Sequence, residues 1–201
     1  SLFFEIFTLK EKFLKKIFTI FLNYSDKIIF INPGDFKFFI QNSNIKEKSY
    51  LIPTEGVQKI KLNEKKNNKK NFIFFARLIN EKEIIDFIEL SKKVKKKYPF
   101  CNFFIAGPIS KNIIGQSSLL NIEYILGKNK KYINYLGYIK NYKKIFPKMD
   151  CLVAPSKLEG AGTSVMEAMQ SGLFIIAYSN TGHNYVLKET GNIICNKNNI
   201  D

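Results

Sequence analysis

Short apolar runs alternate with amphipathic stretches through the later part of the chain. Apolar strand candidates occur at 72–76, 102–106, 132–136, 150–154 and 173–177, with a weaker one at 193–195. Helical patterns lie between them, near 81–97, 117–127, 140–147, 163–171 and 183–189. Short apolar strands that alternate with helices are typical of βαβ units. The pattern therefore predicts an α/β fold, a doubly wound, Rossmann-like parallel sheet with helices on both faces.

The earlier part of the chain predicts a few further elements. Residues 9–22 place apolar side chains on one helical face and lysines mostly on the other. Such a segment forms either a helix packed on a sheet or a helix lying on an anionic membrane, and both remain open. A buried strand is predicted at 27–31, a turn at 32–34 with Asp35 as the candidate cap of a short helix, and another strand at 50–53.

An almost entirely polar run at 61–71 is the candidate linker between two domains. We therefore expect terminal elements of an incomplete first domain at 1–48, a crossing with this linker at 49–71, and a Rossmann-like domain at 72–201. Ligands of such sheets bind outside the carboxyl ends of the strands, so the residues that directly follow the strands are the candidates for a site.

The composition is that of a globular chain, and its charge has two explanations. The 201 residues are 45% hydrophobic, which argues against disorder, and the net charge of +15 suggests an anionic partner. However, Arg77 is the only arginine among 32 basic residues, and a lysine bias of this kind also follows from AT-rich coding. Both explanations remain open. The lysines are not interleaved with aromatic residues in a nucleic-acid-binding motif, so no nucleic-acid partner is expected.

The three cysteines, Cys101, Cys151 and Cys195, are far apart and lie in or beside apolar runs. This placement predicts buried free thiols rather than a disulfide or a metal site, and it favours a reduced, cytoplasmic compartment. His183 is the only histidine, and no two cysteines have the spacing of metal ligands. No uncharged apolar run of about 18 residues, long enough to span a bilayer, is present.

Two cations follow the first strand of the second predicted domain. Arg77 and Lys82 lie where this strand ends and a helix begins, so an anion bound there would meet the positive end of the helix dipole. Arginine offers a planar fork and lysine a point charge, a combination suited to a diphosphate. A surface ion pair of Arg77 with Glu81 or Glu83 is the alternative.

A glycine-containing loop precedes the next candidate helix. Gly160 and Gly162 allow the backbone to approach a ligand closely, and a helix predicted to start near Thr163 or Ser164 would offer free amides. Together these features predict a phosphate-binding cradle.

Two glutamates flank the same loop. Glu159 lies in the loop and Glu167 in the first predicted helical turn, so both can face one cleft. For Glu167 a capping box with Ser164 is an alternative, and for Glu159 a solvated loop carboxylate.

Residues from about Asp26 to Asn192 resemble the group 1 (family four) retaining glycosyltransferases of the GT-B fold, in particular the bacterial branch that builds lipid-linked, capsular or lipopolysaccharide glycans. The motifs that carry the resemblance are Phe75-Ala76-Arg77-Leu78 with Lys82, Ala154-Pro155-Ser156, Glu159-Gly160 with Glu167-Ala168-Met169, Gly137, Gly172, Gly182 and Ile52-Pro53-Thr54-Glu55-Gly56-Val57. The first is similar to the family's cationic diphosphate clamp and the Glu159–Glu167 pair to its Glu-x7-Glu signature.

The resemblance implies a role for each motif. Catalytic roles fall to Glu159, Arg77 and Lys82, with Glu159 at the donor sugar. The donor-binding set is Arg77, Lys82, Tyr138, Ile139, Glu159, Gly160, Gly162, Thr163, Ser164 and Glu167, in which the two cations hold the diphosphate, Glu167 the ribose and the backbone at 138–139 the base. Neither a metal nor a cofactor is expected, because the cations neutralise the leaving diphosphate.

The implied function is transfer of a hexosyl or N-acetylhexosaminyl group from a nucleotide sugar, expected to be a UDP-sugar, to a saccharide or polyprenyl-linked acceptor in surface-glycan synthesis. The chain resembles a donor domain with a stub of the acceptor domain, so a non-catalytic nucleotide-sugar-binding fragment or a subunit of a split enzyme is the alternative. Tyr185 stands where relatives often have glutamate. The cytoplasm is the expected location, and the inner membrane surface and a separate N-terminal domain remain open as partners.

Overall fold

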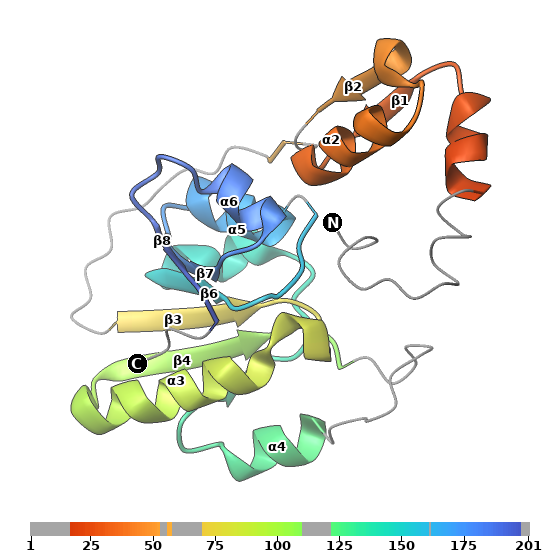
Figure 1. Ribbon diagram of the computed structural model, residues 1–201. Helices are drawn as coiled ribbons and strands as arrows, with labels where there is room; N and C mark the ends of the chain where they lie inside the picture. Colours follow the sequence, from red (N-terminus) through yellow and green to blue (C-terminus); the bar gives the residue numbers. More distant parts are fainter. Residues whose placement is uncertain (1–16, 53–55, 58–69, 110–121, 161, 198–201) are drawn as a thin grey trace.

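The computed structural model describes residues 17–52, 56–57, 70–109, 122–160 and 162–197, which form a small unit and a larger one (Figure 1). Several predicted segments lie outside the described residues, namely 9–16, 53–55, 61–69 and 117–121. Residues 17–23, the end of the first predicted helix, are helical.

The small unit is a parallel strand pair with a helix between the strands. β1 (Ile28–Phe30) pairs with β2 (Ser49–Leu51), and α2 (Pro33–Asn42) and the short 3-10 helix η1 (Lys46–Lys48) connect them. The core of the unit is formed by the buried side chains of Ile28, Phe30, Phe39 and Ile45. β2 lies within the predicted crossing at 49–71, but its pairing with β1 makes it part of the small unit.

Asn32, and not Asp35, caps α2. The Oδ1 atom of Asn32 accepts hydrogen bonds from the backbone N–H groups of Gly34 at 2.7 Å and Asp35 at 3.2 Å. Pro33, at the first helical position, has no N–H to satisfy, so the helix can begin directly after Asn32. Asp35 therefore lies in the first turn of the helix, where its charge favours the helix dipole.

The larger unit confirms the doubly wound α/β prediction. Its six strands are all parallel and lie in the order β5-β4-β3-β6-β7-β8. The strands are β3 (Lys70–Phe75), β4 (Cys101–Ala106), β5 (Asn134–Tyr135), β6 (Cys151–Ala154), β7 (Phe174–Tyr178) and β8 (Ile193–Cys195). The helices are α3 (Ile84–Lys97), α4 (Ile122–Lys128), α5 (Thr163–Gln170) and α6 (Thr181–Val186), with the 3-10 helices η2 (Asn80–Lys82), η3 (Tyr142–Lys144) and η4 (Phe146–Lys148).

Each face of this sheet has its own core, because successive side chains of a strand point to opposite faces. On β3, Phe74 packs with α3 and α4, whereas Ile73 packs with α5 and η4. Phe87 of α3 is fully buried on the first face and Val165 of α5 on the second. Helices on both faces thus leave only the strand ends of the sheet for a ligand.

Two predicted elements differ in the structure. The helical pattern at 140–147 forms the two short 3-10 helices η3 and η4, since Pro147 cannot donate the hydrogen bond that a continuous helix needs. The polar run at 61–71 ends earlier than predicted, because Lys70 and Asn71 are the first residues of β3. Asn71 is held there by Asp150, whose Oδ2 atom accepts from its backbone N–H at 2.8 Å.

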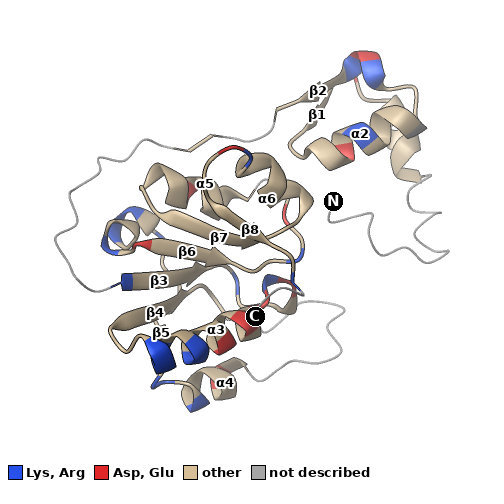
Figure 2. Cartoon of the chain, turned by 60° about the vertical axis from the view of Figure 1, so that its left-hand side comes forward, with Lys and Arg blue, Asp and Glu red and all other residues tan. Residues whose placement is uncertain are grey.

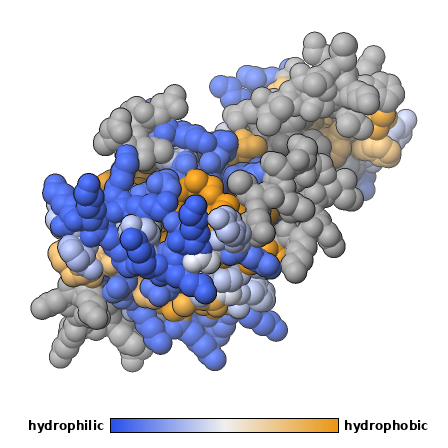
Figure 3. Space-filling view, turned by 90° about the horizontal axis from the view of Figure 1, so that it is seen from below, coloured by the Kyte–Doolittle hydropathy of each residue, from blue (hydrophilic) through white to orange (hydrophobic). Residues whose placement is uncertain are grey.

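The surface is charged unevenly. α3 carries acidic residues towards its start and lysines in its last turn (Figure 2), and the face that bears α3 and α4 is mostly hydrophilic (Figure 3).

Cys101 and Cys151 are buried free thiols, as predicted, whereas Cys195 is only partly buried. Within the described ranges no helix combines the length and the apolarity that a membrane span requires.

Candidate functional site

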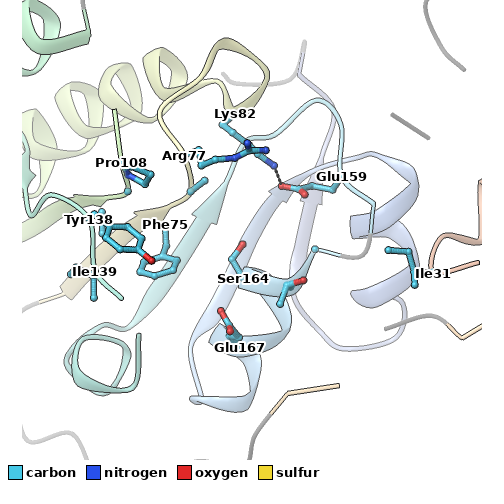
Figure 4. A pocket seen from close by; sticks show the side chains of 15 residues that line it. Ile31, Phe75, Arg77, Lys82, Pro108, Tyr138, Ile139, Glu159, Ser164 and Glu167 are labelled. Carbon is cyan, nitrogen blue, oxygen red and sulfur yellow. Dashed lines mark hydrogen bonds and ion pairs between the residues drawn. The ribbon is translucent and has the colours of Figure 1, made fainter. Parts of the chain in front are cut away.

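A cavity of about 540 Å³ lies at the carboxyl ends of β3, β4 and β6, beside the start of α5 (Figure 4). Its lining residues are Ile31, Phe75, Ala76, Arg77, Lys82, Ala106, Gly107, Pro108, Tyr138, Ile139, Glu159, Gly162, Thr163, Ser164 and Glu167. The structure therefore brings together nine of the ten predicted site residues, and Gly160 lies next to them in the loop. This is the edge of the sheet at which parallel folds bind ligands.

Arg77 provides an exposed cation at one side of the cavity. The predicted alternative, an ion pair with Glu81 or Glu83, is not formed, and the guanidinium has no hydrogen-bonding partner among the described residues. Glu83 instead pairs with Lys157 and, at 2.9 Å, with Lys197. Burial alone would raise the pKa of Glu83, but the hydrogen bonds from the two lysines outweigh it and lower this pKa. Arg77 is thus left available for an anion.

Lys82 and Glu159 form an ion pair inside the cavity, which the sequence did not indicate (Figure 4). Their side chains are only 15% and 16% exposed. The backbone brings them together, because the N–H of Lys157 donates to the carbonyl of Glu81 at 3.0 Å and so ties η2 to the loop after β6. The two cations therefore differ: Lys82 is partly neutralised, whereas Arg77 has no ion pair within the described residues.

No side chain of the described residues caps the first turn of α5. Gly162 occupies the N-cap position with φ 60°, a conformation that glycine adopts without strain, and no side chain accepts from the first amides. Among the described residues the amides of Thr163 and Ser164 have no backbone partner, whereas that of Val165 donates to Gly162, and the helix dipole adds positive potential. Because Thr163 and Ser164 also line the cavity, this turn can bind an anion.

Glu167 does not cap α5. With Gly162 at the N-cap, Glu167 is the fifth helical residue, so the capping box predicted with Ser164 is wrong. The Glu167 side chain lines the cavity, and within the described part of the chain its carboxylate has no hydrogen bond or ion pair. Burial raises the pKa of this carboxyl. A partly desolvated acceptor of this kind is suited to hydroxyl groups of a ligand.

The remaining wall of the cavity is apolar and aromatic. Tyr138 is 69% exposed and lies near Phe75 and Ile139 (Figure 4). Gly107 makes this arrangement possible, because a Cβ atom there would overlap the carbonyl oxygen of Ala76. Its N–H donates to the carbonyl of Gly137 at 2.9 Å, which fixes the loop that carries Tyr138. The wall offers a flat surface next to backbone polar groups, as a nucleobase requires.

Sequence reasoning missed the contribution of the small unit. Ile31 lines the cavity, and the adjacent Asn32 donates to the loop that carries Glu159. The Asn-Pro-Gly turn was visible in the sequence, but a contact across more than a hundred residues has no local signal. Among the residues that the structure describes, no group of three or more histidine, cysteine, aspartate or glutamate side chains is arranged to hold a metal ion.

Known proteins with similar sequences and folds include several transferases. The chain is 28% identical over 185 residues to α-monoglucosyldiacylglycerol synthase of Acholeplasma laidlawii, covering 86% of this chain and 44% of that protein. A crystal structure of an S. aureus TarM mutant in complex with fondaparinux, α-GlcNAc-glycerol and UDP has a TM-score of 0.75 at 21% identity, with 92% of this chain and 37% of that chain covered. Anabaena Alr3699/HepE, in complex with UDP and glucose, has a TM-score of 0.73 at 16% identity, with 94% and 54% covered.

The chain thus spans less than half the length of the curated relatives that it matches. The two structures share its fold, a Rossmann-like parallel sheet of the GT-B type. A family model described as glycosyl transferases group 1 matches residues 57–201, which include the whole six-stranded sheet and all but one of the cavity residues. The chain belongs to the group 1 glycosyl transferases.

Proposed function

We propose that the cavity binds a UDP-sugar and that the protein transfers its hexosyl or N-acetylhexosaminyl group, with retention of configuration, to a saccharide or lipid-linked acceptor in surface-glycan synthesis. The complexes of TarM and HepE with UDP support this donor class. The glycolipid in the name of the A. laidlawii relative supports this acceptor class.

The observation that carries the proposal is the distribution of charge within one cavity. An unpaired Arg77 and the free first turn of α5 can contact a diphosphate, while Glu167 offers a carboxylate without a protein partner to the ribose hydroxyls. The backbone and side chains at Tyr138 and Ile139 lie where the base would follow. These groups match, in order, the parts of a nucleoside diphosphate.

The chemistry of the transfer follows from the same groups. As the bond between sugar and diphosphate breaks, negative charge develops on the leaving phosphate, and Arg77, Lys82 and the helix terminus would stabilise it without a bound metal. In our proposal Lys82 turns towards this phosphate and loosens its ion pair with Glu159. Glu159 would then be free to accept a hydroxyl of the donor sugar, so donor binding and release of the pair are coupled.

A nucleotide-sugar-binding role without transfer is the second candidate. The observation that favours it is that, among the described residues, every lining residue except Ile31 belongs to the larger unit, so the nucleotide can be held mainly by this unit. Transfer of labelled sugar to any saccharide or lipid-linked acceptor would exclude this candidate.

Calorimetric titration with UDP, UMP and ADP tests the donor proposal. We expect UDP to bind more tightly than UMP, because UMP lacks the phosphate that Arg77 would contact, and more tightly than ADP, because the cavity wall has to accept a larger base. Lys96→Ala removes one exposed positive charge at the far end of α3, away from the cavity. It controls for the loss of one positive charge anywhere on the surface and should bind UDP as the wild type does. Equal affinity for UDP and UMP would contradict the proposal.

A further inference from the structure

Asn32 makes contacts that a helix cap does not require. It is 1% exposed, and its Oδ1 atom already serves the cap of α2 through Gly34 and Asp35. Its Nδ2 atom crosses to the larger unit and donates to the carbonyl oxygens of Gly160 at 2.9 Å and, more weakly, Glu159 at 3.4 Å. Both ends of one amide are therefore used, one within the small unit and one on the loop of the candidate site.

α6 also contacts the same loop. A Cβ atom at Gly182 would lie 2.6 Å from the carbonyl oxygens of both Glu159 and Gly160, so only glycine permits this approach. α6 is itself anchored, because Asn180 caps it by accepting from the N–H of His183 at 2.8 Å and donates to the carbonyl of Ser156 at 2.8 Å.

The small unit also packs directly on α6. A Cβ atom at Gly34 would lie 2.8 Å from Cγ2 of Thr181, and α2 lies next to α6 (Figure 1). The carbonyls of Glu159 and Gly160 are thus close to both Asn32 and Gly182, and the side chain of Glu159 is directed to Lys82 in the cavity. A displacement of the small unit would act on the backbone of Glu159 through Asn32.

We propose that Asn32 is a positioning residue for Glu159: through its Nδ2 atom, the small unit fixes the loop so that the Glu159 carboxylate can contact the donor sugar. The inference rests on the proposed function and adds to it a specific route by which the small unit determines sugar recognition. The nucleoside and diphosphate contacts at Glu167, Arg77 and the start of α5 are made by residues that Asn32 does not touch, so we expect them to depend less on Asn32 than the contact of Glu159 does.

Asn32→Asp tests the proposal, because it preserves the oxygen that caps α2 and replaces the N–H donor with a charged acceptor oxygen. The ligands are UDP and whichever of UDP-glucose and UDP-N-acetylglucosamine the wild type binds more tightly. We expect the variant to bind this sugar nucleotide about tenfold more weakly and to bind UDP within about twofold of the wild type. Asn141→Asp makes the same chemical change at an exposed cap, that of η3, and should leave both affinities unchanged.

Two further variants separate the loss of the hydrogen bond from other effects. Asn32→Ser keeps a capping oxygen, adds no charge and cannot reach the loop, so it should reproduce the loss of sugar-nucleotide affinity. Gly182→Ala places a Cβ atom against the same carbonyls and should also lower sugar-nucleotide affinity. If Asn32→Asp fails to fold, as judged by thermal denaturation, the criterion applies to Asn32→Ser.

The outcomes distinguish the inference from the proposed function. Unchanged binding of the sugar nucleotide by folded Asn32 variants, or an equal loss for UDP and the sugar nucleotide, would overturn the positioning role while leaving the donor site intact. A wild-type protein that binds neither ligand would overturn the proposed function itself, and the inference with it.

Discussion

Arg77 stands at a position where lysine would not be equivalent. The planar guanidinium can form two parallel hydrogen bonds to a phosphate, whereas an ammonium offers a point charge. We expect Arg77→Ala to weaken UDP binding by about 1.5–3 kcal/mol, the usual contribution of a charged hydrogen bond. Arg77→Lys should recover only part of this loss. Calorimetric titration measures both, and unchanged affinity in the two variants would show that Arg77 is only a solvated surface residue.

Glu167 gives a prediction with a definite pH dependence. Its carboxylate must be ionised to accept from two ribose hydroxyls, and burial raises its pKa. UDP affinity should therefore fall as the pH is lowered, and the fall should begin at a higher pH than for an ordinary glutamate. Glu167→Gln should bind UDP more weakly than the wild type at neutral pH, and its affinity should lack this pH dependence. The wild type should also prefer UDP to deoxy-UDP.

Since Glu167 caps no helix, Glu167→Gln should leave the melting temperature nearly unchanged. Equal binding of UDP and deoxy-UDP by the wild type, together with normal UDP binding by the variant, would remove Glu167 from the site.

Substitution of Glu159 should not weaken the binding of UDP, unlike substitution of Glu167. It partly neutralises Lys82, so Glu159→Gln leaves the full lysine charge for the diphosphate. We expect UDP to bind the variant at least as tightly as the wild type, whereas the intact sugar nucleotide should bind more weakly because the sugar loses its acceptor. Measuring both ligands on the same preparation gives the contrast, and a parallel loss of both would mean that Glu159 supports the loop rather than the sugar.

At the scale of elements, the sequence predicted the larger unit well because its signals are local. Short apolar strands and helical periodicity between them located every strand of the six-stranded sheet. The errors fall where a tertiary contact decides the outcome. Asn32 rather than Asp35 caps α2, and its amide also donates to the loop at Gly160. α5 begins at Thr163 after the N-cap Gly162, with no capping box.

Alanine substitutions at Gly107, after β4, and at Gly127, in α4, should change the stability in opposite directions. Gly107 has φ 155°, and a side chain there would overlap the carbonyl oxygen of Ala76. Gly107→Ala should therefore lower the free energy of unfolding by more than about 1 kcal/mol. Gly127, within α4, has no atom near its potential Cβ position, so Gly127→Ala should raise it by about 0.5–1 kcal/mol. Denaturation curves that shift in the same direction for both variants would contradict this account.

For the whole molecule, the limits of sequence reasoning concern how the two units meet. Nine of the ten candidate residues line one cavity, but neither the Lys82–Glu159 ion pair nor the contact of Asn32 with the loop follows from spacing along the chain. Both contacts join residues of different elements through a backbone path that only the fold defines. The sequence could therefore predict which residues lie at the cavity, and not how they are partnered.

The excess of lysine gives the last prediction, which concerns the chain as a whole. A net charge of +15 makes the folded state repel itself, because folding brings the lysines closer together than they are in the unfolded chain. Added salt screens this repulsion, and the Debye length falls from about 30 Å at 0.01 M to about 10 Å at 0.1 M. We therefore expect the free energy of unfolding, measured with urea because urea is uncharged, to rise as potassium chloride is added and to level off above about 0.3 M.

Screening also weakens ion pairs such as Lys157–Glu83 and Lys197–Glu83, which opposes the gain. Because exposed pairs contribute little, repulsion should dominate, and a fall in stability with salt would show instead that these pairs outweigh the net charge.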